Sequence, residues 1–150
     1  MIKNRKIFYV LGIAVLVFVL AIVLNRKDAN DFKVEKVQIG NSVITVELAN
    51  TEKTRVQGLS GRTSLATSTG MFFVFDRSSR WGIWMKDMNF PIDVIWITED
   101  FKIAYIVESM LPESFPKVYV PNYPVKYILE VPAGTVLNAG AKVGQDVVVN

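Results

Sequence analysis

The 150-residue chain contains no cysteine and no histidine. The absence of cysteine excludes thiol nucleophiles, cysteine-ligated zinc or iron–sulfur centres, and disulfides. The absence of histidine excludes Ser-His-Asp triads and imidazole general bases. Neither GxGxxG nor GxxxxGK[ST] occurs, so the usual phosphate-binding loops are missing. Any catalyst must use carboxylates, Lys, Tyr, Ser or Thr. We expect no cofactor and no metal site, and an enzyme is the less favoured interpretation.

The basic charge of the chain is confined to its first 30 residues. The formal net charge is +3. Five basic residues against one acidic residue give +4 in residues 1–30, and residues 31–150 carry 12 basic and 13 acidic side chains, a net charge of −1. A nucleic-acid-binding domain needs a basic face of its own. We therefore expect no nucleic-acid partner.

Residues 7–24 form an apolar run in which only Gly12 falls outside the apolar set. As a helix, 18 residues span about 27 Å, close to the thickness of a bilayer core. Residues 1–6 are a basic flank and residues 25–33 a polar linker. We predict an uncleaved signal-anchor helix, single-pass in the cell membrane, with the N-terminus inside and the domain outside. The alternative is secretion after cleavage of a signal peptide, although the run is long for one and lacks a small-x-small site.

Short apolar runs separated by turn residues fill the rest of the chain. Strands are predicted at 34–39, 43–48, 71–75, 81–88, 92–98, 101–107, 125–131 and 146–149. Short helices are predicted at 51–57, capped by Asn50, and from Pro132 to before Gly140. A polar turn at 76–80 and an extended loop at 108–124 complete the pattern. We predict a mostly β (α+β) domain over residues 34–150, a compact β-sandwich or barrel with two short helices.

An ordered set of short motifs runs through this domain. They are ANTE (49–52), GLSGR (58–62), GMFFVF (70–75), WMKDM (84–88), PID (91–93), LEVPAG (129–134), Gly140 and GQD (144–146). The set resembles a widespread prokaryotic family, domain of unknown function 192, over about residues 43–149. The resemblance implies a compact, mostly β domain and no particular reaction. Two departures are visible, because the family usually has Met at Ser60 and Asn-Thr at Asp87-Met88.

Charged residues inside these motifs are the first candidates for a ligand-binding site: Arg62, Lys86, Asp93 and Glu130. Asp93 alternates with Ile95 and Ile97, so it is expected to share a buried face with them and to need partners. Arg62 is a candidate for that partner through a bidentate fork. The structural interpretation, an internal ion pair, competes with ligand binding at these residues.

Aromatic residues are the second group of candidates. Trp84 lies three residues after Trp81, so strand parity places one in the core and one nearer the surface. Tyr119 lies in the proline-rich loop, where recognition residues are common. Core packing is the alternative use of these residues.

The acidic residues Asp87, Asp93 and Glu130 also allow a carboxylate pair for hydrolysis. The sequence favours a membrane-tethered extracytoplasmic domain that binds a peptide, a glycan or another envelope partner. The alternatives are a carboxylate-based hydrolase of envelope polymers and a structural accessory of another membrane protein. An open apolar groove would favour binding, a groove holding Asp93 and a second carboxylate would favour the hydrolase, and a filled barrel would favour the accessory.

Overall fold

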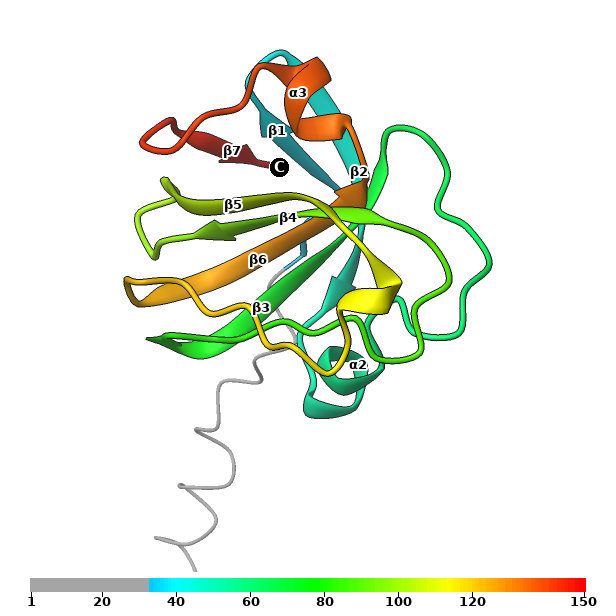
Figure 1. The fold of residues 1–150 in the computed structure, drawn as a ribbon. Coiled ribbons are helices and arrows are strands. Elements are labelled where there is room, and N and C mark those ends of the chain that lie inside the picture. Colours follow the sequence, from blue (N-terminus) through cyan, green and yellow to red (C-terminus); the bar gives the residue numbers. More distant parts are fainter. Residues whose placement is uncertain (1–32) are drawn as a thin grey trace, which may run out of the picture. The chain divides into compact units, whose positions relative to one another are not determined.

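Seven strands and two short α-helices follow one another along residues 33–150, the part of the chain that the computed structural model describes (Figure 1). In chain order they are β1 (Lys36–Ile39), β2 (Ser42–Ala49), α2 (Glu52–Gln57), β3 (Thr69–Ser79), β4 (Ile92–Ile97), β5 (Ile103–Met110), the 3-10 turn η2 (Pro112–Ser114), β6 (Val125–Pro132), α3 (Thr135–Ala139) and β7 (Val147–Val149). Within this part of the chain, no helix is long and apolar enough to cross a membrane. The predicted anchor at 7–24 lies outside the described residues.

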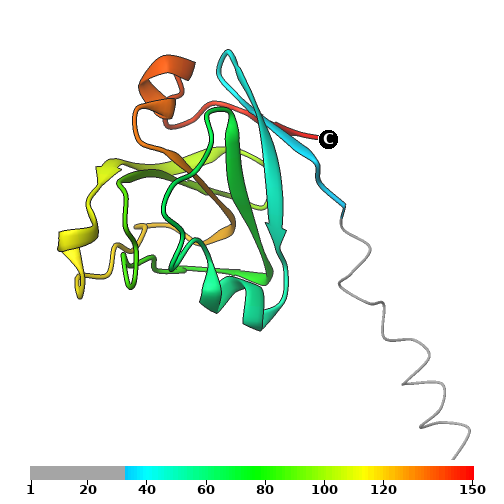
Figure 2. The ribbon, with the colours of Figure 1, turned by 90° about the vertical axis from the view of Figure 1, so that its right-hand side faces the viewer.

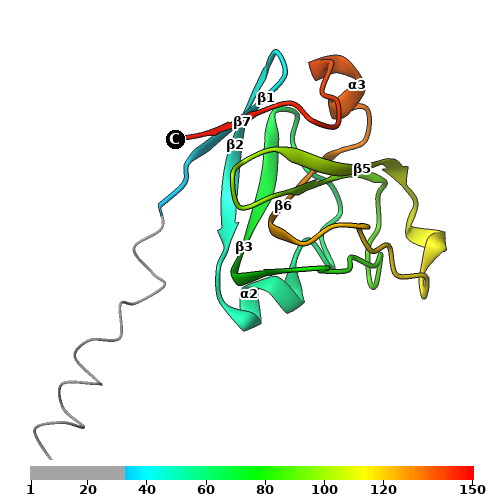
Figure 3. The same cartoon turned by 90° about the vertical axis from the view of Figure 1, so that its left-hand side faces the viewer.

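All seven strands belong to one curled sheet, a half-barrel, in the order β5-β4-β6-β3-β2-β1-β7. The predicted β-rich domain with two short helices is confirmed, but the domain is one sheet and not a sandwich of two. Backbone hydrogen bonds link the two edges, since Val147 N–H donates to Phe101 and Ile103 N–H donates to Gln145. Figure 3 views the edge strand β7 beside β1. The short helices lie at opposite ends of the sheet in all three ribbon views.

The first elements form largely where the residue patterns predict them. Ile39 pairs with Ser42, so Gly40 and Asn41 make a two-residue hairpin turn, and Gly40 takes the positive φ of 50° that such a turn favours. Helix α2 begins one residue later than predicted, because Thr51 and not Asn50 is its N-cap. The Thr51 hydroxyl accepts from the Thr54 N–H at 3.2 Å while the Thr54 hydroxyl accepts from the Thr51 N–H.

Two predictions around residue 80 are wrong. Residues 76–80 were expected to form a turn, yet β3 continues to Ser79, which pairs with Val125 across a bulge. Residues 81–88 form no strand, and their ladder is reduced to one bridge between Ile83 and Tyr119. Because no further strand is available to pair with residues 81–88, this segment crosses over the sheet as a loop. The parallel pairing of β2 with β3, reached through α2 and the loop 58–68, was also not predicted (Figure 2).

The sheet buries both of its faces, and alternate residues of the central strands enter two different cores. On β6, Leu129 and Val131 join the core that includes Ile95 and Ile97, whereas Ile128 joins the core that includes Trp96. Helix α3 contributes to the first core, through Val136 and Ala139. Loops such as 80–91 cover the second. This division decides on which side each candidate residue lies.

Candidate functional site

A cavity of about 680 Å³ opens on the second face of the sheet. Its floor is the sheet itself, with Phe73 and Phe75 from β3, Ile92 from β4 and Glu130 from β6. Helix α2 with the turn after it and the loop 81–88 supply the walls. The side chains are mostly apolar or aromatic, which is the composition expected of a small-molecule or side-chain pocket.

Glu130 is the acidic residue of this floor. It lies on β6 opposite Met71 of β3 and Val94 of β4, and only 5% of it is exposed. Burial raises the pKa of its carboxyl group to about 8, while the nearby charge of Arg62 opposes that rise. The carboxyl group therefore holds its proton at neutral pH.

The Glu130 carboxyl group makes no hydrogen bond to any residue in the range 33–150. Every completely enclosed side-chain polar atom in the same range does have a partner. The two Glu130 oxygens must therefore reach the open space of the cavity. A buried polar group left without a partner costs free energy, so a ligand that supplies the partner gains affinity.

Arg62 lies near this carboxylate but is paired elsewhere. Its Nη1 and Nη2 donate to the two carboxylate oxygens of Glu47 at 2.6 and 2.7 Å. This bidentate pair lowers the pKa of Glu47 and raises that of Arg62. The expected fork exists, but its partner is Glu47 and not Asp93, because Asp93 faces the other side of the sheet.

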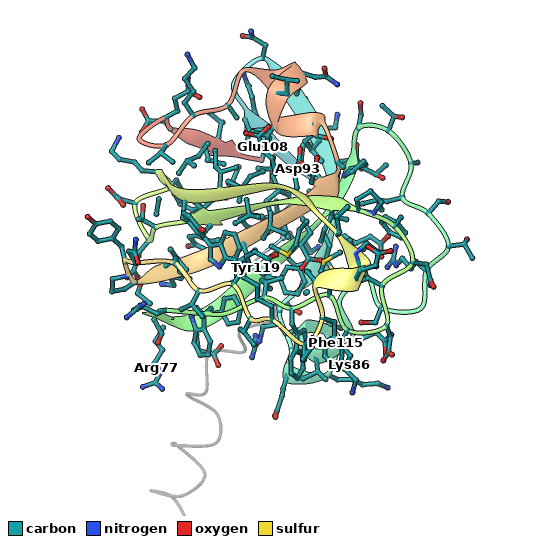
Figure 4. All side chains as sticks on the ribbon, in the orientation of Figure 1. Arg77, Lys86, Asp93, Glu108, Phe115 and Tyr119 are labelled. Carbon is teal, nitrogen blue, oxygen red and sulfur yellow. The ribbon has the colours of Figure 1, made fainter. Side chains whose placement is uncertain are left out.

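Asp93 is fully buried and shares the first core with Ile95 and Ile97, as predicted. Its partners are two backbone amides: Ser109 N–H donates to Oδ1 at 2.8 Å and Val136 N–H to Oδ2 at 2.9 Å. The second bond caps α3 from a neighbouring strand, which stabilises the helix N-terminus. Figure 4 shows Asp93 beside α3 and away from Lys86. Asp93 therefore lies outside the cavity and cannot pair with Glu130.

The two tryptophans differ in exposure but do not follow the parity prediction, because no strand carries them and both face the same cavity. Trp81 is partly buried, and its ring stacks on Phe75 with 4.4 Å between centroids. Trp84 is 52% exposed, and its ring forms an edge-to-face contact with Phe115 with 6.0 Å between the ring centroids. Both tryptophans line the cavity. Trp84 and Glu130 are thus the two candidates that the structure brings together.

The other three candidates lie outside the cavity lining. Lys86 and Asp87 are exposed, and their carbonyls accept from the Ser60 hydroxyl and the Gly61 N–H. Both contacts tie the loop 81–88 to the turn after α2. Tyr119 exchanges two backbone hydrogen bonds with Ile83, and the Lys117 ammonium lies over its ring at 4.3 Å. These residues support the cavity wall and do not face its interior.

Arg55 of α2 lines the cavity and was missed. Its Nη1 donates to the carbonyls of Asn50 and Val74, each at 2.8 Å. Its guanidinium lies 5.4 Å from the Phe75 ring centroid, and its Nη2 is 4.0 Å from Asp76. The sequence offered one signal, a basic residue in the last turn of the predicted helix, and helix-end stabilisation already explains that. In the described range, no three acidic side chains gather as a metal site would require.

Comparison with known proteins identifies relatives whose roles are open. The profile of the DUF192 family, described as an uncharacterised ancient conserved region, matches residues 35–149. No curated protein matches the chain. A solved structure from Sinorhizobium meliloti 1021, described as a "putative transcription regulator", is 32% identical with a TM-score of 0.73, covering 79% of this chain and 95% of that one. A protein of unknown function from Novosphingobium aromaticivorans DSM 12444 is 26% identical with a TM-score of 0.71, covering 75% of this chain and 83% of that one. The chain belongs to the DUF192 family.

Proposed function

We propose that this DUF192 domain is a binding module, whose cavity receives an apolar group presented by a peptide, a glycan or another partner in the cell envelope. The observation that supports this proposal is the cavity of about 680 Å³, lined by aromatic side chains and floored by an unpaired carboxyl group. Apolar walls with one oriented polar group are the usual composition of a recognition pocket. The exposed Trp84 at the cavity gives a partner a large surface to contact.

The competing functions fit the geometry less well. A hydrolase that uses Asp93 with Glu130 would need both on one face, and they lie on opposite faces of the sheet. A purely structural accessory leaves the open cavity without a use. Direct contact with nucleic acid, which the name of the Sinorhizobium protein suggests, is opposed by the charge of −1 on residues 31–150.

Blocking the cavity tests the proposal. Val56 of α2 lines the cavity and is 74% exposed, so Val56→Trp narrows the entrance without disturbing the core. Val143→Trp is the matched control, since Val143 is 61% exposed and lies away from the lining. The probe is 4-phenylbutan-1-ol, titrated calorimetrically into the full chain in lipid nanodiscs and into empty nanodiscs. The proposal is supported if the probe binds wild type and V143W and its affinity for V56W is lower by at least about tenfold. Equal heats for wild type, both variants and empty nanodiscs reject it.

We place this module outside the cytoplasm, tethered by residues 7–24, because of the length of that run and its flanking charges. The test is the mass of the membrane-extracted protein together with protease access in intact cells. A full-length chain whose domain is digested from outside supports the placement. A mature chain that starts near residue 26, or a protected domain, rejects it.

A further inference from the structure

The charges around the cavity leave one carboxyl group unmatched. Three acidic residues line it, Glu52, Asp76 and Glu130, against two arginines, Arg55 and Arg77. The Arg55 guanidinium is held by two carbonyls and lies beside Asp76. Glu52, Asp76 and Arg77 are exposed at the cavity mouth, where water solvates them. Glu130 is buried and has no partner in the range 33–150.

Arg62 does not supply the missing partner. Both of its terminal nitrogens are committed to Glu47 in a bidentate pair, and it is not among the residues that line the cavity. Its positive charge acts on Glu130 only from a distance. The floor therefore presents a carboxyl group that the described chain leaves without a hydrogen-bond partner and without an adjacent cation.

From this geometry we infer that the cavity binds an organic ammonium group carried on an apolar stem, an inference that rests on the proposed binding function. The ammonium lies at the Glu130 carboxylate and the stem lies along the aromatic walls. A charge-assisted hydrogen bond to a desolvated carboxylate is among the stronger polar contacts in proteins. The aromatic faces strengthen it, because a cation over an aromatic ring is attracted by the ring quadrupole. The cavity wall already shows this contact, since the Arg55 guanidinium lies over Phe75.

Binding of an ammonium also moves a proton. The raised pKa of about 8 means that Glu130 is protonated at pH 7, so pairing with an ammonium requires the carboxyl group to release its proton to solvent. The charged groups around the carboxyl group are Arg62, whose charge acts on it, and the cavity-lining residues Glu52, Arg55, Asp76 and Arg77. Proton release that is present in wild type and lost in Glu130→Gln is therefore the signature of Glu130.

Three probes of nearly the same shape test the inference: 4-phenylbutylamine, 4-phenylbutan-1-ol and 4-phenylbutanoate. Calorimetry on the full chain in nanodiscs, corrected with empty nanodiscs, gives each affinity. Calorimetry at pH 7 in buffers of different ionisation enthalpy gives the protons released. We expect the amine to bind about tenfold or more tightly than the alcohol, the carboxylate to bind weakest, and the amine alone to release a proton.

Glu130→Gln should abolish both the preference for the amine and the proton release, while alcohol binding stays. Glu108→Gln is the matched control, since Glu108 is exposed on β5 and does not line the cavity, and it should behave like wild type. Equal binding of amine and alcohol, tightest binding of the carboxylate, or an amine preference that survives in E130Q overturns the inference while leaving the binding function intact. Failure of all three probes overturns the binding function itself.

A lysine peptide separates two sources of the ammonium. Acetyl-Gly-Lys-Gly-amide is compared with acetyl-Gly-norleucine-Gly-amide, which has the apolar stem without the charge. Tighter binding of the lysine peptide supports the inference with a peptide as the source. A preference shown by the free amine but not by the lysine peptide supports it with a small amine as the source.

Discussion

The stability of this domain should fall as the pH rises from 5 to 8, and Glu130 should be the cause. Its pKa is raised from an ordinary value of 4.5 to about 8 because the charged form is desolvated in the folded state. Between these two values the folded chain keeps a proton that the unfolded chain has lost. The free energy of unfolding therefore decreases with pH across this window, by about 1.4 kcal/mol per pH unit.

The size of the effect follows from the shift. A difference of about 3.5 pH units corresponds to about 5 kcal/mol between pH 4 and pH 9, of which about 3 kcal/mol is lost between pH 5 and pH 7.5. For a domain of this length, the second figure is worth roughly 10 °C in melting temperature. Glu130→Gln keeps the shape of the side chain and removes the titration. Relative to wild type, the variant should gain stability steadily as the pH rises.

Other shifted groups titrate outside this window. The pKa of Glu47 is lowered by Arg62, so its contribution is present above pH 4.5 and is lost only as the pH falls below that value. Lys102 and Lys126 have raised pKa values, so their contributions are lost only above pH 10. The chain has no histidine. Any remaining titration, including that of the amino terminus, is common to wild type and variant and cancels in the comparison.

The assay is urea unfolding of the full chain in detergent at pH 5, 6, 7 and 8, followed by tryptophan fluorescence. Trp81, Trp84 and Trp96 are the three tryptophans of the chain and all lie in the domain, so the signal reports its unfolding. The expected result is a wild-type curve that falls while the Glu130→Gln curve stays level. Parallel curves for the two proteins between pH 5 and 8 would show that the carboxyl group is solvated, and would refute the reasoning.

Three further substitutions test the framework around the site. Asp93→Ala leaves the buried Val136 amide and the partly buried Ser109 amide without an acceptor, so unfolding experiments should show a loss of about 2 kcal/mol or more. A loss below about 1 kcal/mol would contradict the capping role. Arg62→Ala breaks a partly exposed ion pair and should lower the free energy of unfolding by no more than about 1 kcal/mol beyond the control Arg77→Ala. The pKa of Glu130 should rise in the same variant, because an opposing charge is gone. An unchanged dependence of stability on pH would count against that coupling. In Gly40→Ala the new Cβ would lie 2.1 Å from a backbone carbonyl oxygen, whereas the new Cβ of Gly61→Ala, also at positive φ, meets nothing within 4 Å. The melting temperature of Gly40→Ala should therefore lie well below that of Gly61→Ala. Equal melting temperatures would reject the clash.

Much of the fold could be predicted from local patterns. The alternation in residues 43–48, the Gly40-Asn41 turn and the left-handed Gly140 after α3 each fix a local geometry that tertiary contacts did not override. The failures lie where long-range pairing decides. Residues 81–88 are rich enough in β-favouring side chains to be a strand, yet no neighbouring strand is free to pair with them beyond the bridge to Tyr119. The parallel β2–β3 pair depends on a crossover that no local residue pattern specifies.

The site shows the same limit in sharper form. Glu130 is the one charged residue in the apolar run from Tyr127 to Val131, and that alone marks it as unusual, because a central strand seldom carries an unpaired charge. The remaining positions of the run are all apolar, however, so there is no alternation that could show which face of the sheet the carboxyl group joins. Only the register with β3 and β4 shows that Glu130 and Asp93 lie on opposite faces. Two buried acids with similar sequence surroundings then take different roles: Asp93 is satisfied by backbone amides and stabilises the fold, whereas Glu130 faces the cavity with its oxygens unpaired, which leaves it the one available to a ligand.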